Sequence, residues 1–117
     1  MRLVLASTFS PNMLGLSEGE ERAVFIKRIS LETARDIVKK ATDRYSIVGH
    51  ESTARLMSEM LGVNVPANRV QYLIKDYDTV LVVTLAFRPP EGKVYTYNEL
   101  RQLYKEGKIA IYIVDAL

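Results

Sequence analysis

The chain has 117 residues, of which 48% are apolar and 26% are charged, and its formal net charge is +2. This length fits one domain with one core, and the balanced composition argues against a disordered or fibrous protein. The small net charge argues against a protein that tracks along duplex nucleic acid, although it suits a compact anionic ligand held in a pocket.

The sequence has no cysteine, which excludes disulfides, thiolate metal sites and cysteine nucleophiles. The apolar stretch after Met1 is much too short for a signal peptide. No run approaches the roughly 20 apolar residues that a membrane helix needs. We therefore expect a soluble, cytoplasmic protein.

The first part of the chain predicts two strands and then a helix. Apolar and β-branched residues predict strands at Leu3–Ala6 and Val24–Ile29. Between them, Gly15–Glu21 is rich in glycine and charged residues and is a candidate for a lid. Ser30 is a good N-cap, and apolar residues recur at helical spacing from Ala34 to Ala41.

A short strand and a second helix follow. The segment Tyr45–Val48 predicts the strand. The helix should begin just after His50 and run to Leu61, with Gly62 as its C-terminal stop. His50 then lies at a strand-to-helix junction, where active sites of open α/β sheets tend to gather.

The remainder predicts a hairpin, a helix and a last strand. Val70–Ile74 and Thr79–Phe87 form the predicted hairpin, which Pro89 and Pro90 end. Thr96–Glu99 is a capping-box pattern that opens a helix through Tyr104.

Gly107 closes that helix, and Ile109–Val114 is the final strand. The predicted order is β-β-α-β-α-β-β-α-β. This order indicates an α/β or α+β fold, a mixed sheet flanked by helices in a single domain over residues 1–117.

His50 is the only histidine, and histidine is suited to general acid or base work near neutral pH. The alternative is a structural or incidental histidine. Ser52 and Thr53 place hydroxyls and unpaired backbone N–H groups at the helix start, which favours a phosphate or another anion. Plain N-capping by one of these two hydroxyls is the competing interpretation.

The loop after the predicted hairpin is the second candidate. Two prolines stiffen a segment that carries Arg88, Glu91 and Lys93, and such a loop can clamp a phosphate. Arg88 would stabilise negative charge, and Glu91 would orient the histidine or accept a proton. The alternative is a surface turn with a solvated salt bridge. A third segment, Phe9–Met13, offers short polar side chains that are also common turn formers.

Other chemistries have less support. The single histidine and scattered carboxylates show no metal-ligand spacing, and no Walker loop or dinucleotide fingerprint is present. Ser52 lies next to His50, but no nucleophile-elbow motif surrounds it. Half-buried packing is the default expectation for four tyrosines: Tyr95, Tyr97, Tyr104 and Tyr112.

Five segments, in this order along the chain, resemble the viral anti-CRISPR ring nucleases: Phe9–Leu14, Val48–Ala54, Asn68–Val70, Arg88–Val94 and Leu103–Ile109. The match runs nearly end to end, so it is more specific than any one motif. It departs at Ala6–Thr8, where relatives can carry an asparagine before the Phe-Ser pair, so we expect an altered polar contact to the ribose there.

The resemblance implies a homodimer that binds cyclic tetra-adenylate, the second messenger of type III CRISPR systems, at the dimer interface. It implies cleavage without a metal or other cofactor, which gives linear di-adenylate with a 2′,3′-cyclic phosphate and switches off the antiviral signal. In the family's pattern His50 is the general acid, Arg88 stabilises charge on the phosphate, and Glu91 holds one of them in place. The implied ligand-binding residues are Ser10, Asn12, Gly49, Ser52, Thr53, Asn68 and Arg69.

The main alternative is a non-catalytic module, viral or cellular, that binds a nucleotide or DNA, and His50 would then be dispensable. A structural dimer without a ligand is a third possibility. Neither duplex nucleic acid nor a membrane is expected as a partner. The predicted helix from Ser52 to Leu61 is too mixed in charge to resemble one that enters a DNA groove.

Overall fold

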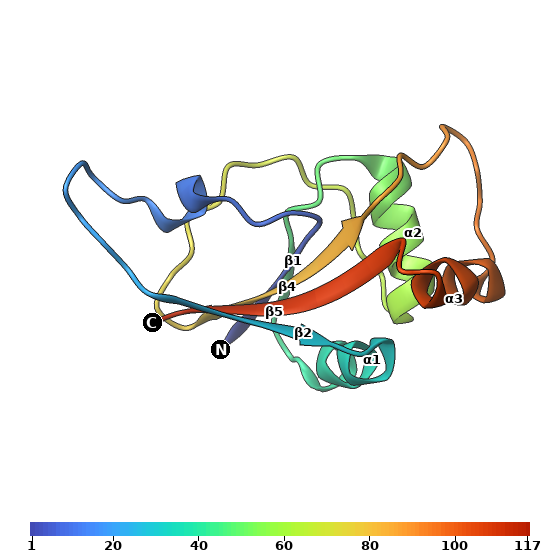
Figure 1. Cartoon of the computed structure of the whole chain (residues 1–117), viewed down its shortest axis with the longest axis horizontal. Coiled ribbons are helices and arrows are strands. Elements are labelled where there is room, and N and C mark those ends of the chain that lie inside the picture. The colour runs from blue at the N-terminus through green and yellow to red at the C-terminus, as the bar shows by residue number, and fades with distance from the viewer.

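The computed structural model describes residues 1–117, which form a five-stranded mixed sheet with three α-helices and one short 3₁₀-helix (Figure 1). The elements, in chain order, are β1 (Arg2–Ala6), η1 (Pro11–Leu14), β2 (Val24–Ile29), α1 (Leu31–Lys40), β3 (Arg44–Ser46), α2 (Glu51–Leu61), β4 (Asp78–Leu85), α3 (Tyr97–Lys105) and β5 (Ile109–Ala116). The predicted α+β class with a mixed sheet and flanking helices is confirmed. No helix is long and apolar enough to cross a lipid bilayer.

The sheet has the strand order β2-β5-β4-β1-β3. Strand β1 pairs in parallel with β3 on one side and with β4 on the other. Strand β5 pairs antiparallel with β4 and with β2, so β2 is an edge strand. Because β1, β3 and β4 run in the same direction, their carboxyl ends meet at one edge of the sheet.

Two apolar clusters cover the two faces of the sheet, because successive side chains of a strand point to opposite sides. Leu3, Leu5 and Leu81 belong to the larger cluster, together with residues of all three helices. Val4 and Val80 belong to the smaller cluster, in which irregular segments take the place of helices. Figure 1 shows the three α-helices gathered toward one end of the molecule and the long loop between β1 and β2 at the other.

The local signals for the helices are confirmed. The hydroxyl of Ser30 accepts a hydrogen bond from the N–H of Thr33 and caps α1. Thr96 and Glu99 form the reciprocal capping box of α3. Gly62 ends α2 with φ +75°, a left-handed conformation that favours glycine. All four tyrosines expected to pack are half-buried, which confirms that expectation.

The predicted strand at Val70–Ile74 is wrong, and so is the hairpin built on it. Both edges of β4 are already occupied, by β1 and by β5, so no edge remains for this segment to pair with. It crosses the helix-free face instead, where the N–H of Ile74 donates to the carbonyl of Met13 at 2.8 Å. The apolar, β-branched composition that suggested a strand serves to cover this face of the sheet.

The short strand expected at Tyr45–Val48 lies slightly earlier, at Arg44–Ser46. The N–H of Ile47 still donates to the carbonyl of Leu5 at 2.9 Å, and the chain then leaves the sheet. This departure follows from the short partner, because β1 itself ends at Ala6. The gap between β3 and α2 gives room for the turn that precedes His50.

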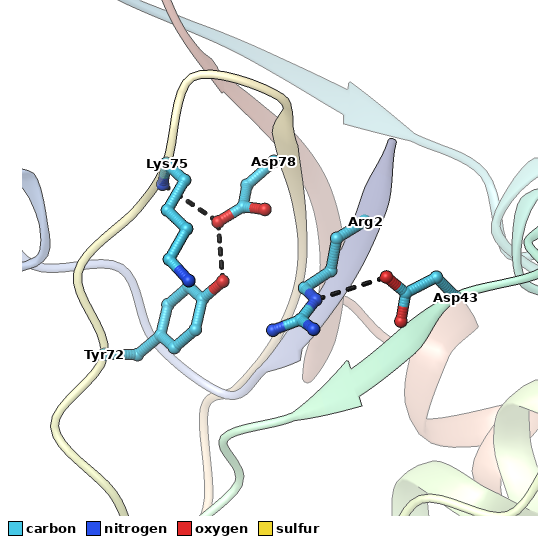
Figure 2. A network of polar contacts seen from close by, with 5 residues as sticks. All are labelled: Arg2, Asp43, Tyr72, Lys75 and Asp78. Carbon is cyan, nitrogen blue, oxygen red and sulfur yellow. Dashed lines mark hydrogen bonds and ion pairs between the residues drawn. The ribbon is translucent and has the colours of Figure 1, made fainter.

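A polar network fixes the Val70–Ile74 segment, which we call the crossing segment, to the amino ends of the strands (Figure 2). The carboxylate of Asp78, only 7% exposed, accepts from the hydroxyl of Tyr72 at 2.6 Å and from the N–H of Lys75 at 2.9 Å. The ring of Tyr72 lies 5.4 Å from that of Tyr45, over which the guanidinium of Arg2 lies at 4.9 Å. Burial raises the pKa of Tyr72, and the hydrogen bond to Asp78 raises it further.

We expect Tyr72→Phe to lower the free energy of unfolding by about 1.5 kcal/mol, because the buried carboxylate of Asp78 loses one of its two donors. Urea denaturation followed by circular dichroism measures this change. Tyr77→Phe is the matched control, since Tyr77 is 83% exposed. Equal unfolding midpoints for both variants would show that the hydrogen bond from Tyr72 to Asp78 does not stabilise the fold.

The raised pKa of Tyr72 also predicts a pH dependence. Above the ordinary tyrosine pKa of about 10, the unfolded chain loses the phenol proton while the folded chain retains it, so stability falls as the pH rises. Urea midpoints from about pH 8 to about pH 11 should therefore fall more steeply for the wild type than for Tyr72→Phe. Parallel curves would contradict the prediction.

Candidate functional site

The segments that the sequence singled out follow the carboxyl ends of the three parallel strands. The Phe9–Met13 segment follows β1, His50 follows β3, and the Arg88–Lys93 loop follows β4. The carboxyl edge of parallel strands is where open α/β sheets bind ligands. Parallel pairing therefore collects these segments at one edge, although they are far apart in the sequence.

The two main candidates meet in one open cleft of about 670 Å³. Figure 1 shows the loop between β4 and α3 beside the amino-terminal end of α2. Polar and charged residues, two prolines and a glycine make up the lining: His50, Glu51, Ser52, Thr53, Arg55, Arg88, Pro89, Pro90, Glu91, Gly92 and Lys93. The cleft thus brings His50, Arg88 and Glu91 together. No group of three or more His, Cys, Asp or Glu side chains is placed to hold a metal ion.

His50 itself is the N-cap residue of α2, with extended backbone angles φ −114° and ψ 131°. Its side chain is exposed and makes no capping hydrogen bond, and neither Ser52 nor Thr53 caps the helix, so that interpretation is wrong. The helix begins at Glu51, two residues earlier than a Ser52 cap would require. The first-turn N–H groups, without a side-chain acceptor, carry the positive end of the helix dipole to the cleft.

The Arg88–Lys93 loop is held at both ends and free in its middle. At one end Phe87 packs edge-on against Tyr95, with ring centroids 6.2 Å apart. At the other end Lys93 makes an ion pair with Glu99, 3.2 Å from Nζ to Oε2. Arg88 is exposed and makes no hydrogen bond or ion pair, and the same holds for Glu91. The surface ion pair expected as the alternative therefore involves neither of these two residues.

Glu99 is engaged through both carboxylate oxygens. Its Oε1 accepts from the N–H of Thr96 at 3.0 Å, and its Oε2 accepts from the ammonium of Lys93 at 3.2 Å. The backbone N–H of Thr96, and then Lys93, hold the pKa of Glu99 below its ordinary value. The ammonium of Lys93 also lies over the ring of Tyr95, 5.1 Å from its centroid. These contacts fix where the loop ends relative to α3.

Ser10 and Asn12 do not reach this cleft within one chain. They line a separate cavity of about 430 Å³ that also includes Ser7, Thr8 and residues of the crossing segment. The hydroxyl of Ser10 accepts from the N–H of Asn12 at 3.2 Å and caps η1. The Gly15–Glu21 stretch lies at the opposite end of the molecule from α2 (Figure 1), so it cannot cover the cleft of its own chain.

Asn68, Arg69 and Gly49 shape the approach to His50 without lining the cleft. The amide side chain of Asn68 donates to the carbonyl of Ser46 at 2.8 Å, and its N–H donates to the carbonyl of Val48 at 2.8 Å. The aliphatic stem of Arg69 lies against Gly49. A Cβ added at Gly49 would lie 3.4 Å from the Cγ of Arg69. Asn68 therefore anchors the turn that presents His50.

Sequence reasoning missed Arg55, which lines the cleft from the second turn of α2. The spacing held a usable signal, because Glu51 and Arg55 are four residues apart and share a helix face. A helix that opens at a candidate catalytic residue presents this face to the same ligand. The basic residues on this helix face can then contact the ligand as well as solvent.

Comparison with known proteins places nearly all of the chain in one family. The model of the STIV B116-like family matches residues 3–112. The solved structure of B116 of Sulfolobus turreted icosahedral virus superposes with a TM-score of 0.86 and 26% identity, covering 98% of this chain and 99% of that one.

The sequence relatives include viral and cellular proteins. Protein 26 of Sulfolobus islandicus filamentous virus is 36% identical over 92 residues, 77% of this chain and 76% of the relative. The YddF protein of Bacillus subtilis is 29% identical over 77 residues, 65% of this chain and 71% of that one. The matched span and the shared fold lead to one conclusion: the chain belongs to the STIV B116-like family.

Proposed function

We propose that this protein is a ring nuclease that opens cyclic tetra-adenylate to linear di-adenylate without a metal ion. The observation that carries the proposal is the shared cleft, in which His50 at the start of α2 faces the same space as Arg88 and Glu91. A proton donor, a cation and an uncapped helix terminus are groups suited to phosphodiester cleavage.

The reaction follows from these groups. The ribose 2′-hydroxyl attacks the adjacent phosphorus, the bond from phosphorus to the 5′-oxygen of the next nucleotide breaks, and His50 gives that oxygen its proton. Arg88 and the N–H groups at the start of α2 stabilise the negative charge that builds up on the phosphate. Glu91, without an ion-pair partner, is a carboxylate available to orient His50 or take the proton of the 2′-hydroxyl. The product ends in a 2′,3′-cyclic phosphate and a 5′-hydroxyl.

A homodimer accounts for the second cavity. A ring of four identical nucleotides can present equivalent phosphodiesters to two equivalent sites, so each subunit would supply one His50. Ser10 and Asn12 lie outside the cleft of their own chain. In a two-fold dimer with the ring at the interface, they would contact the ligand away from the bond that breaks.

Cleavage of the ring would inhibit type III CRISPR signalling. Membership of a family with viral relatives supports this role, because a virus gains from removing a defence signal. The open, polar cleft also supports a second candidate, a module that sequesters the nucleotide without turnover. The products of incubation distinguish the two, since sequestration leaves the ring intact.

We expect purified protein with cyclic tetra-adenylate in EDTA to give linear di-adenylate with a cyclic phosphate. His50→Ala should slow this reaction by about 10²–10⁴-fold, because the leaving oxygen loses its proton donor. Chromatography with mass spectrometry identifies the products, and calorimetry checks that the variant still binds the ring. An intact ring after incubation with wild-type protein would contradict the enzyme hypothesis and favour the sequestering module.

Replacing Arg88 should affect the chemical step. Arg88→Ala should lower kcat by about 10²-fold, because the guanidinium opposes charge that is greatest in the transition state. Lys105→Ala is the control, since it removes one exposed cation from the last turn of α3 outside the cleft. A rise in KM with unchanged kcat would assign Arg88 to ground-state binding alone.

A further inference from the structure

A smaller groove adjoins the His50 cleft farther along α2. It has a volume of about 200 Å³ and lies between α2 and the chain that leads into α3. Its lining consists of Arg55, Leu56, Ser58, Glu59, Lys93, Val94 and Tyr95. Only Arg55 and Lys93 line both this groove and the cleft, so the passage between the two is bounded by two cations.

The charge of Arg55 is available to a ligand. Glu51 lies one helical turn earlier, at the spacing that favours an ion pair, yet the two side chains do not pair within 4.0 Å. The guanidinium of Arg55 makes no hydrogen bond to any other side chain or carbonyl, and the residue is exposed. It thus retains the whole fork of donors that matches a phosphate.

Lys93 is instead held in position before any ligand arrives. Glu99 accepts one hydrogen bond from its ammonium, and the ring of Tyr95 lies beneath it. An ammonium has three donors, so others remain for an anion. Because the side chain is already restrained at the rim of the cleft, binding through it costs less conformational entropy than binding through a free lysine.

The position of the two cations sets them apart from Arg88. Arg55 is five residues beyond His50, so the two lie about 7.5 Å apart along the helix axis. This separation is on the scale of the spacing between neighbouring phosphates of a nucleotide chain and exceeds the size of a single phosphate. A phosphate at the amino terminus of α2, beside His50 and Arg88, would therefore have its neighbour at the passage between cleft and groove.

We propose that Arg55 and Lys93 form a second phosphate-binding subsite, which takes the phosphate next to the one cleaved at His50. The inference rests on the proposed function for the identity of the ligand. The subsite selects ligands with at least two consecutive phosphates. Its contacts are the same before and during the reaction, so it contributes to binding and not to the chemical step.

Two ligands that cannot be cleaved test the subsite by calorimetry or by NMR titration. One is the ring of four 2′-deoxyadenylates, and the other is the 2′-deoxy dinucleotide d(ApA), which has a single phosphate. Arg55→Ala and Lys93→Ala should each weaken binding of the deoxy ring about tenfold, and each should reduce the slope of log affinity against log salt by about 0.7. Both should change the affinity for d(ApA) by less than about twofold.

Two further variants separate a charge contact from a structural effect. Lys93→Arg should restore most of the ring affinity and the salt slope, because the positive charge returns. Lys105→Ala should leave both unchanged, since that exposed lysine lies outside both cavities. With cyclic tetra-adenylate itself, Arg55→Ala and Lys93→Ala should raise KM with kcat within about threefold of wild type.

The subsite is overturned if Arg55→Ala and Lys93→Ala behave like Lys105→Ala, or if they weaken d(ApA) as much as the ring. Failure of the proposed function gives a different result. Suppose that the ring binds but is never cleaved, and that the two variants still show weaker affinity and a smaller slope of log affinity against log salt. This result would support the subsite and contradict the nuclease activity. If neither deoxy ligand binds the wild-type protein, both fall.

Discussion

The parallel pairing of β1 with both β3 and β4 is the constraint on which the rest of this structure depends. Because β1 is buried on both faces, its apolar run of Leu3–Ala6 fixes its place inside the sheet. Parallel neighbours must all end at the same edge. Backbone hydrogen bonds between the strands therefore bring together the turn before His50 and the loop that carries Arg88. The cleft depends on this strand pairing.

The start of α2 illustrates how local stability and function oppose each other. Ser30 and Thr96 cap their helices with side-chain hydrogen bonds, whereas α2 begins at His50 without one. A missing cap typically costs about 1 kcal/mol. The same absence leaves the first-turn N–H groups open to an anionic ligand. The one helix that breaks the capping rule is the one that lines the cleft, which is where such departures are expected.

The two faces of the sheet are covered by different kinds of segment. Helices cover one face, whereas η1 and the crossing segment cover the other, held by the network around Asp78. The network and the His50 cleft lie at opposite ends of β4, which begins at Asp78 and leads into the Arg88 loop. The cavity with Ser10 lies on the irregular face, and the His50 cleft lies on the helical one. Under the proposed function, a two-fold partner would let both contact one symmetric ring.

The sequence by itself determined the three helices, the N-caps of α1 and α3, and the strands β1, β2, β4 and β5, because these depend on neighbours within a few residues. It also identified His50, Arg88 and Glu91 as candidates, from chemistry and resemblance. Only the tertiary structure decided that Val70–Ile74 is not a strand, since strand pairing needs a free edge and β4 has none. Likewise, the separation of Ser10 from His50 and the sharing of Arg55 and Lys93 by two cavities depend on distances between segments far apart in the chain. No local pattern encodes such distances, because strand order and packing set them.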